Sequence, residues 1–267
     1  MDTSLFDRFR TVIASSSEAD IRRDVMLGGK LTLAKEGALE ISYAPFEHIV
    51  EAAQVVIVGI TPGTQQATNA LLEARRQIHA GVDNRAALAA AKGYGSFSGA
   101  MRESLVKMLD RAGLHAALGL ASCGEFWGRG HRLVHFTSAL RNPVFVNGKN
   151  YNGSPSMIRS PLLRDVIENS LAAEVRALPD ALWISCGDKA AVGLKWLVEK
   201  GFLDRKRVCF GMPHPSPANS ERIRYFLGVG RLRHELSSKT NPDRIDQDKA
   251  EMVTKVSDFF GQRKVLA

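Results

Sequence analysis

The sequence predicts an α/β protein, a three-layer α/β/α sandwich around a central, mainly parallel sheet of four strands. Two observations favour this fold class. The run Val55–Ile60 is continuously apolar and rich in β-branched residues, which is typical of a strand buried on both faces of a parallel sheet. Shorter apolar runs follow later in the chain, and segments with helical spacing separate them, as expected when helices connect parallel strands.

The first fifty residues are predicted to form an N-terminal extension that packs on the core. Residues 4–28 are expected to be helical, because their phenylalanines and β-branched residues share one face. Residues 31–46 alternate around Gly37, which indicates a β-hairpin or an extended arm. Residues 47–54 are expected to be helical and to lead into the first strand of the sheet.

Residues 51–267 are predicted to form a single globular domain. Glycine and proline divide its periodic segments, so the element boundaries follow from the turn residues. The expected elements are helices at 65–92 with a break at Gly81, a glycine-rich loop at 93–99, a helix at 100–118 with a stop at Gly113, a strand at 133–138, a loop-rich segment at 141–155, a helix at 160–177, a strand at 181–185, a helix at 188–200, a strand at 207–212 and a helix at 245–260.

Composition restricts the class of protein. The apolar fraction of 45% and the charged fraction of 24% are typical of a soluble globular protein, and no apolar run reaches the length of a membrane span. The net charge of +8 fits a polyanionic partner, but by itself it does not require one, because many basic proteins bind no nucleic acid. The three cysteines, Cys123, Cys186 and Cys209, form no C-x-x-C pair, so we expect neither a metal nor another cofactor. We expect a monomer in the cytoplasm of a bacterial-type cell, associated with the nucleoid and not with a membrane.

The loops that follow the predicted strands carry the chemical signals. In open α/β sheets, ligands bind beyond the carboxyl ends of the strands, so these loops are expected to line one cleft. GITPG (59–63) by itself predicts only a tight turn. HPSPAN (214–219) is more specific, because its prolines make a rigid loop that can hold an imidazole and backbone N–H groups in place.

Together and in this order, GITPG and HPSPAN resemble the two signature motifs of the uracil-DNA glycosylase superfamily. GITPG is similar to the form found in the mismatch-specific and single-strand-selective branches, and HPSPAN to the single-strand-selective and classical forms. GYGSFS (93–98) resembles the family loop in which a Phe-Ser pair precedes a helix. The resemblance covers about residues 55–225. It implies a monofunctional DNA glycosylase for base-excision repair, which flips uracil or a modified pyrimidine out of single- or double-stranded DNA and leaves an abasic site.

The resemblance also implies residue roles. The catalytic candidates are His214 and Thr61. The substrate-binding candidates are Gly59, Ile60, Pro62, Gly63, Phe97, Ser98, Ser138 and Asn142. The DNA-binding candidates are Pro215, Ser216, Pro217, Asn219, Arg222, Arg224 and Lys189. Phosphate contacts are expected from Ser98, Ser216 and the backbone N–H groups of the Pro-Ser-Pro loop.

These roles have physical reasons. The target base must leave the stack, because its glycosidic bond is inaccessible inside a duplex. An aromatic platform such as Phe97, or Tyr94 as the second choice, contributes about 1–3 kcal/mol per base. Cleavage leaves negative charge on the departing base, and a preorganised donor such as His214 contributes about 3–4 kcal/mol.

The sequence departs from the family pattern at two places. Thr61 stands where related branches have Asn, Asp or Glu, and a hydroxyl can hold a water but is a poor base near neutral pH. No clear asparagine occupies the end of the second strand, where the family reads the pyrimidine edge. Thr137, Ser138 and Asn142 are the open options there. The long helical stretch at 65–92 is expected to reshape the pocket.

Beside HPSPAN, four arginines accompany a single acid, Glu221, which favours contacts to DNA phosphates. They are Arg222, Arg224, Arg231 and Arg233. Three alternatives stay open: a glycosylase for a bulky or hypermodified base, as in viral DNA, with a role in defence; a non-catalytic DNA-binding relative; and an unrelated nucleotide-binding α/β protein. GITPG argues against the last, because it lacks the glycine-rich phosphate-binding pattern.

Overall fold

The computed structural model describes residues 4–24 and 29–266, which divide into two compact units. Each unit is built from segments that lie far apart in the sequence. Unit 1 holds the chain up to Glu51 together with Ile60–Gly99 and Phe136–Ala177. Unit 2 holds Ala52–Gly59, Ala100–His135 and the chain from Leu178 onward. The first fifty residues are therefore grouped with two later segments in unit 1.

The predicted α/β class is confirmed, with a four-stranded parallel sheet flanked by helices, consistent with a three-layer sandwich. The strand order is β4-β3-β7-β8. In unit 2, β3 pairs with β7 and β7 with β8, both in parallel. Every residue of β3 and β7 is buried, which explains why the sequence shows no polar alternation there. The bounds are β3 (Val55–Gly59), β7 (Leu182–Cys186), β8 (Val208–Met212) and β4 (Val134–Ser138), which continues from unit 2 into unit 1.

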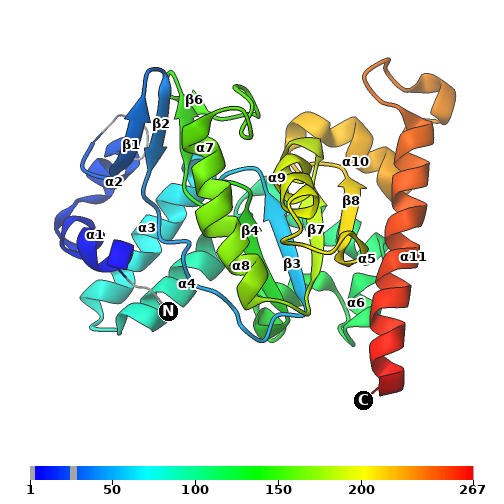
Figure 1. Cartoon of the computed structure of the whole chain (residues 1–267), viewed down its shortest axis with the longest axis horizontal. Coiled ribbons are helices and arrows are strands. Elements are labelled where there is room, and N and C mark those ends of the chain that lie inside the picture. Colours follow the sequence, from blue (N-terminus) through cyan, green and yellow to red (C-terminus); the bar gives the residue numbers. More distant parts are fainter. Residues whose placement is uncertain (1–3, 25–28, 267) are drawn as a thin grey trace. The chain divides into compact units, whose positions relative to one another are not determined.

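Helices cover this sheet in unit 2. The helix α9 packs on β3 and β7, and α11 runs along β8 (Figure 1). Gly113, at a φ of 79°, separates α5 from α6, as its place in the sequence predicts. The α-helices are α5 (Ala100–Arg111), α6 (Leu114–Ala117), α9 (Asp188–Glu199), α10 (Ser220–Leu227) and α11 (Pro242–Leu266). Short 3-10 turns lie at Cys123–Trp127, His131–Leu133, Arg205–Arg207, Pro217–Asn219 and Arg233–Glu235.

Unit 1 combines helices with a second sheet, which is antiparallel in the order β1-β2-β5-β6. The predicted hairpin around Gly37 is confirmed as β1 and β2, with Gly37 at a φ of 57°. The elements are α1 (Ser4–Ser15), α2 (Glu18–Asp24), β1 (Thr32–Glu36), β2 (Leu39–Ser42), α3 (Thr64–His79), α4 (Asn84–Gly95), β5 (Val144–Val146), β6 (Lys149–Asn150), α7 (Pro161–Val166), a π-helical turn (Ile167–Leu171) and α8 (Ala172–Ala177). One apolar core joins α1, α2, α3 and α4 to the hairpin.

Four local expectations need correction. The segment 4–24 forms two helices in place of the single helix predicted over 4–28, because the Ser17 hydroxyl accepts the Asp20 N–H and caps the second helix. Residues 25–28 lie outside the described residues. Residues 47–54 form no helix. Residues 93–95 belong to the end of α4 and not to a loop. The segment 141–155 contains the strands β5 and β6, and Asn147 and Gly148, both with positive φ, form the turn between them. An Asn-Gly pair is a strong hairpin signal, which the loop-rich composition of the segment obscured.

Candidate functional site

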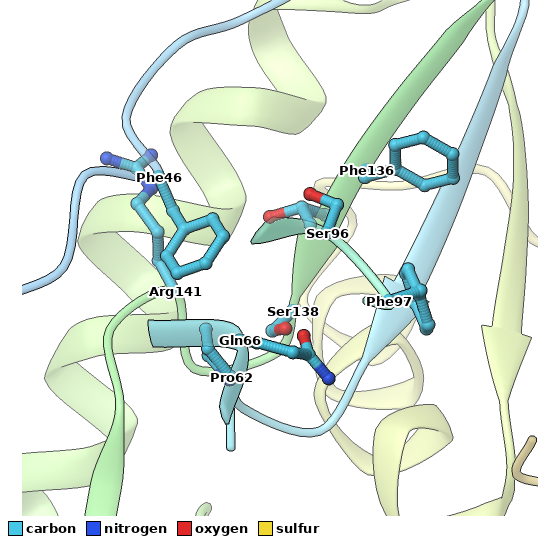
Figure 2. Close-up of a pocket in the computed structure, with 9 residues that line it drawn as sticks. Phe46, Pro62, Gln66, Ser96, Phe97, Phe136, Ser138 and Arg141 are labelled. Carbon is cyan, nitrogen blue, oxygen red and sulfur yellow. The ribbon is translucent and has the colours of Figure 1, made fainter. Parts of the chain in front are cut away.

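A narrow pocket in unit 1 is the first candidate site (Figure 2). It brings together Pro62, from the turn after β3, Phe97, from the loop after α4, and Ser138, at the end of β4. The interior of the pocket is about 10 Å³, which leaves room for about one water molecule. The full lining is Phe46, Pro62, Gln66, Ser96, Phe97, Phe136, Thr137, Ser138 and Arg141. Three of the predicted substrate-binding residues thus share one pocket.

Phe97 is held in an uncommon backbone conformation. Its φ is 49°, in the left-handed region that a bulky residue rarely adopts, and its side chain is only 5% exposed. The helix before it ends at Gly95, where a side chain would approach Ala70 Cβ within 2.8 Å. The Phe97 ring lies 5.7 Å from the Phe136 ring at an angle of 59°. Backbone strain of this kind collects at functional sites, so the loop is a reasonable candidate for ligand contact.

Two neighbours of Phe97 do not line this pocket. The Ser98 hydroxyl accepts a hydrogen bond from Asn69 Nδ2 at 3.0 Å, so Ser98 faces α3. Tyr94 is 58% exposed on α4. The structure therefore favours Phe97 over Tyr94 as the aromatic residue of the site.

The polar part of the pocket wall holds unpartnered groups. Thr137 is 8% exposed, and its Oγ1 has no hydrogen-bond partner in the described part of the chain. The half-buried Gln66 likewise makes no side-chain hydrogen bond within residues 4–24 and 29–266. Figure 2 shows Gln66, Ser96 and Ser138 around the space between Phe46 and Phe97. Because buried polar groups nearly always have partners, the buried Thr137 hydroxyl points to a ligand or an ordered water.

Thr61 ties the turn after β3 to the loop after β4. Its Oγ1 donates to the Asn142 carbonyl at 2.8 Å and accepts the Val144 N–H at 3.1 Å. The Ile60 carbonyl accepts the Leu140 N–H at 3.0 Å beside it. The only hydroxyl proton of Thr61 is therefore used, and one lone pair remains to accept from a water.

The remaining predicted residues near this turn have structural environments. Gly63 precedes the start of α3, where Asn150 Oδ1 accepts from the Thr64 N–H at 3.1 Å and occupies the helix N-terminus. Asn142 is 7% exposed, and its Oδ1 has no partner among the described residues. Gly59 is the buried last residue of β3, in unit 2.

A cluster of buried charges surrounds Arg141, one of the pocket residues. Arg141 Nε donates to Glu174 at 3.0 Å, and Glu174 is fully buried. Burial lowers the pKa of Lys92 to about 7, and Lys92 Nζ donates to the His48 carbonyl at 2.7 Å. Burial raises the pKa of Glu47, which accepts from the Tyr43 hydroxyl at 2.7 Å. Sequence spacing carries no sign of this cluster, because each residue reaches it from a different element.

The second candidate site lies in unit 2, where HPSPAN follows β8. His214 Nδ1 accepts the Ser216 backbone N–H at 3.3 Å, which places the proton of the neutral imidazole on Nε2. Burial lowers the pKa of His214, because the charged form loses its hydration. His214 therefore offers a neutral N–H donor at ordinary pH.

Hydrogen bonds within the loop hold it in place. Asn219 Nδ2 donates to Ser216 Oγ at 3.1 Å, and Arg222 Nη1 donates to Asn219 Oδ1 at 3.3 Å. Pro215 and Pro217 have no N–H, so Ser216 supplies the only backbone donor of the Pro-Ser-Pro segment, and His214 already accepts it. The expected backbone donor to phosphate is thus engaged, whereas the Ser216 hydroxyl keeps its proton for donation.

Gly187 allows the close approach of His214. Its φ is 84°, and a side chain there would place Cβ 2.8 Å from His214 Cβ. Its N–H donates to the Met212 carbonyl at 2.8 Å, which joins the loop after β7 to the end of β8. Lys189, two residues later, is exposed in the first turn of α9. Gly187 is a determinant of the His214 position that the sequence motifs do not show.

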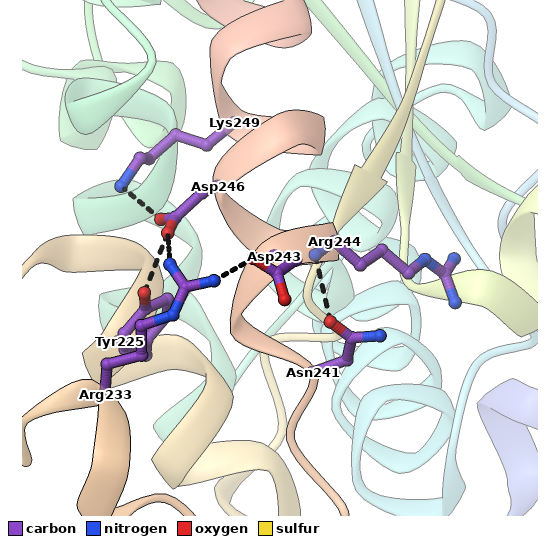
Figure 3. A network of polar contacts seen from close by, with 7 residues as sticks. All are labelled: Tyr225, Arg233, Asn241, Asp243, Arg244, Asp246 and Lys249. Atoms are coloured by element: carbon purple, nitrogen blue, oxygen red, sulfur yellow. Dashed lines mark hydrogen bonds and ion pairs between the residues drawn. The ribbon is translucent and has the colours of Figure 1, made fainter.

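Two of the four arginines after HPSPAN are paired with acids. Arg231 pairs with Glu221 at 3.4 Å, and Arg233 pairs with Asp246 at 3.2 Å and also with Asp243, both on α11 (Figure 3). The acids of α11 thus add to the one acid, Glu221, of the segment itself. Arg222 donates to the Lys239 carbonyl. Exposed Arg224 has no acidic partner in the described ranges, so it is the best phosphate-binding candidate of the segment.

The described residues contain neither a candidate metal site nor a candidate membrane-spanning helix. Within the described residues, no three His, Cys, Asp or Glu side chains gather where they could hold a metal ion. Among the described helices, none combines the length and apolar character that crossing a membrane requires. The three cysteines are free and buried, and burial raises their pKa values, so they are poor nucleophiles.

Comparison with known proteins yields a relative but no function. No family model and no solved structure matches the chain. Among curated proteins, the chain is similar to "Uncharacterized protein YoxB" of Bacillus subtilis (strain 168), with 33% identity over 211 residues. The alignment covers 78% of this chain and 82% of the relative.

Proposed function

The chain belongs to one family with the Bacillus subtilis protein YoxB, and we propose that it is a monofunctional DNA glycosylase. It removes uracil or a modified pyrimidine from DNA and leaves an abasic site. One observation carries the proposal: one pocket is lined by Pro62, Phe97 and Ser138. These residues come from segments with motifs or positions that resemble those of the uracil-DNA glycosylase superfamily.

The unit 1 pocket must widen before it can hold a single planar ring. Its interior of about 10 Å³ is far below the range of about 300–1,000 Å³ typical of ligand sites. Phe46 and Phe97 supply apolar walls, and the orphan Thr137 hydroxyl supplies a polar group that a base edge can satisfy. Because the interior has room for only about one water molecule, side chains must rotate to admit the base.

His214 stabilises the departing base. Cleavage of the glycosidic bond leaves the electron pair on the base, and the negative charge develops chiefly at a carbonyl oxygen. A neutral Nε2–H donor lowers the energy of that charge by about 3–4 kcal/mol when it is preorganised. The Ser216 N–H on Nδ1 and the buried setting keep His214 in this form.

Thr61 contributes mainly by holding the turn. Its remaining lone pair can accept one hydrogen from the attacking water, but the hydroxyl is a poor base near neutral pH. A sugar that is largely cationic when water attacks needs little nucleophilic activation. The same feature favours a second candidate, a DNA-binding relative without catalysis, which the experiment below separates from an enzyme.

DNA is the proposed partner, and the proposed setting is a monomer acting on cytoplasmic DNA. The net charge of +8 supports a polyanionic partner, and exposed Arg224 and Lys189 are the proposed phosphate contacts. The compensated arginines Arg231 and Arg233 contribute less to DNA affinity, because their charges are already paired.

The decisive experiment is single-turnover excision from labelled oligonucleotides that carry uracil, mismatched, oxidised or hypermodified pyrimidines, followed by alkaline cleavage of abasic sites. We expect product from at least one base. His214→Ala should lower the rate by about 10²–10³-fold with DNA affinity nearly unchanged. His131→Ala, a change at an exposed histidine of unit 2, is the matched control and should retain the rate. No product from any base, at enzyme excess and with DNA binding confirmed, would refute the enzyme and leave the DNA-binding relative.

A further inference from the structure

Gln66 is the polar pocket residue that no motif marks. It lies in the first turn of α3, three residues after Gly63, and its side chain lines the pocket (Figure 2). The adjacent Gln65 is exposed and does not line the pocket. Two consecutive glutamines on one helix thus have different environments, and only one of them is available to a ligand in this pocket.

The backbone of Gln66 is held in place although its amide is not. A Cβ on Gly95 of α4 would lie 2.9 Å from the Gln66 carbonyl, so α4 packs directly on this turn. Asn150 Oδ1 accepts from both the Thr64 N–H at 3.1 Å and the Thr64 hydroxyl at 2.9 Å, which fixes the start of α3. The Gln66 amide therefore projects from a rigid position with no hydrogen bond to the described part of the protein.

We propose that Gln66 determines specificity by reading the Watson–Crick edge of the flipped base, an inference that rests on the proposed function. An amide carries an acceptor and a donor side by side, so it can bind an edge where a donor and an acceptor are adjacent. The N3 edge of a pyrimidine has this arrangement. The amide can rotate by half a turn, so both 4-oxo and 4-amino edges satisfy it.

The substrate class follows from this chemistry. The Gln66 amide requires an unsubstituted N3 edge, and it does not discriminate between an oxygen and an amino group at C4. Thr137 Oγ1, buried and without a partner in the described residues, adds a hydroxyl that can donate or accept on the same lining. The pocket is therefore expected to accept pyrimidines with a free N3 edge and to reject pyrimidines alkylated at N3.

The test compares Gln66→Met with Gln65→Met, which makes the same change at the exposed neighbour. Each is assayed on oligonucleotides containing deoxyuridine or N3-methyldeoxyuridine. The wild type should prefer uracil, and Gln66→Met should reduce that preference by about 5–150-fold, the equivalent of one bidentate base contact. Gln65→Met should keep the preference. A folding defect lowers both rates together, so the ratio reports base reading.

A binding measurement separates this inference from the proposed function. Oligonucleotides with 2′-fluorinated nucleotides resist cleavage, so affinity for the two bases can be compared without product formation. If Gln66→Met keeps the wild-type preference in both assays, the inference is wrong while the glycosylase proposal stands. If the wild type cleaves no base and shows no preference in binding, both are wrong. A preference in binding that Gln66→Met removes, without cleavage by the wild type, supports base reading and refutes the enzyme.

Discussion

Replacing Gly187 by alanine tests whether the loop after β7 positions His214. Gly187 has a φ of 84° and a ψ of 166°, a region that is essentially restricted to glycine and costs other residues about 1–3 kcal/mol. The new Cβ would lie 2.8 Å from His214 Cβ and 3.2 Å from His214 N. Relieving an overlap of this size in a packed region costs about 1–3 kcal/mol more.

The two contributions predict that Gly187→Ala lowers the free energy of unfolding by about 2–6 kcal/mol. Natural domains are stable by only about 5–15 kcal/mol, so the effect should be large in a urea titration. The control is Gly201→Ala, also in unit 2. Its φ is 76°, and no described atom lies within 4 Å of the position of its Cβ. Only the backbone contribution, about 1–2 kcal/mol, applies there.

The activity assay gives a second comparison. Gly187→Ala should lower the single-turnover excision rate at a temperature where both variants are folded, because His214 or the loop must shift. Gly201→Ala should leave the rate unchanged. Equal stability losses in the two variants would show that the His214 contact relaxes freely, and the positioning argument would then be wrong.

Three further predictions address other parts of the molecule. Thr61→Val leaves the Asn142 carbonyl and the Val144 N–H without their hydroxyl partner. It should lower the free energy of unfolding, measured by urea titration, by about 1–3 kcal/mol for each group, and Thr61→Ser should retain most of the wild-type stability. Arg224→Ala should reduce the slope of log affinity against log salt by about 0.9 on duplex DNA, whereas Arg231→Ala should change it less, because Glu221 already pairs with Arg231. Burial lowers the pKa of His48 to about 4 from its ordinary 6.5, so between pH 6.5 and pH 4 the unfolded chain binds a proton that the folded chain does not. The free energy of unfolding should therefore fall as the pH falls from 6.5 towards 4. His48→Gln should make this decrease smaller.

Local signals predict most of the elements. The strands β3, β7 and β8 are recognisable because short, mainly apolar runs without alternation are suited to a sheet covered on both faces. Gly37, Gly81 and Gly113 mark turns because their positive φ values favour glycine. The hairpin of β5 and β6 was also predictable from the sequence, because the Asn-Gly pair between the two strands is a local turn signal.

The charge balance of the arginine segment was not predictable from its neighbours in the sequence. Figure 3 shows Arg233 bonded to Asp243 and Asp246, which lie on α11. Asp246 also accepts from Tyr225 at 2.8 Å and pairs with Lys249 at 3.5 Å. A local count of charges around HPSPAN omits α11, so it overstates the charge available to DNA.

By itself, the sequence determined where the chain forms strands, helices and turns, and in which order its two motifs occur. These properties depend on backbone conformation and on apolar periodicity over a few neighbouring residues. Only the tertiary structure decided which polar groups are available for chemistry. The Thr61 hydroxyl is engaged by a carbonyl 81 positions away, whereas the amide of Gln66 and the hydroxyl of Thr137 have no partner in the described chain. The physical reason is that a hydrogen bond needs two groups within about 3 Å, and folding brings such groups together from distant segments.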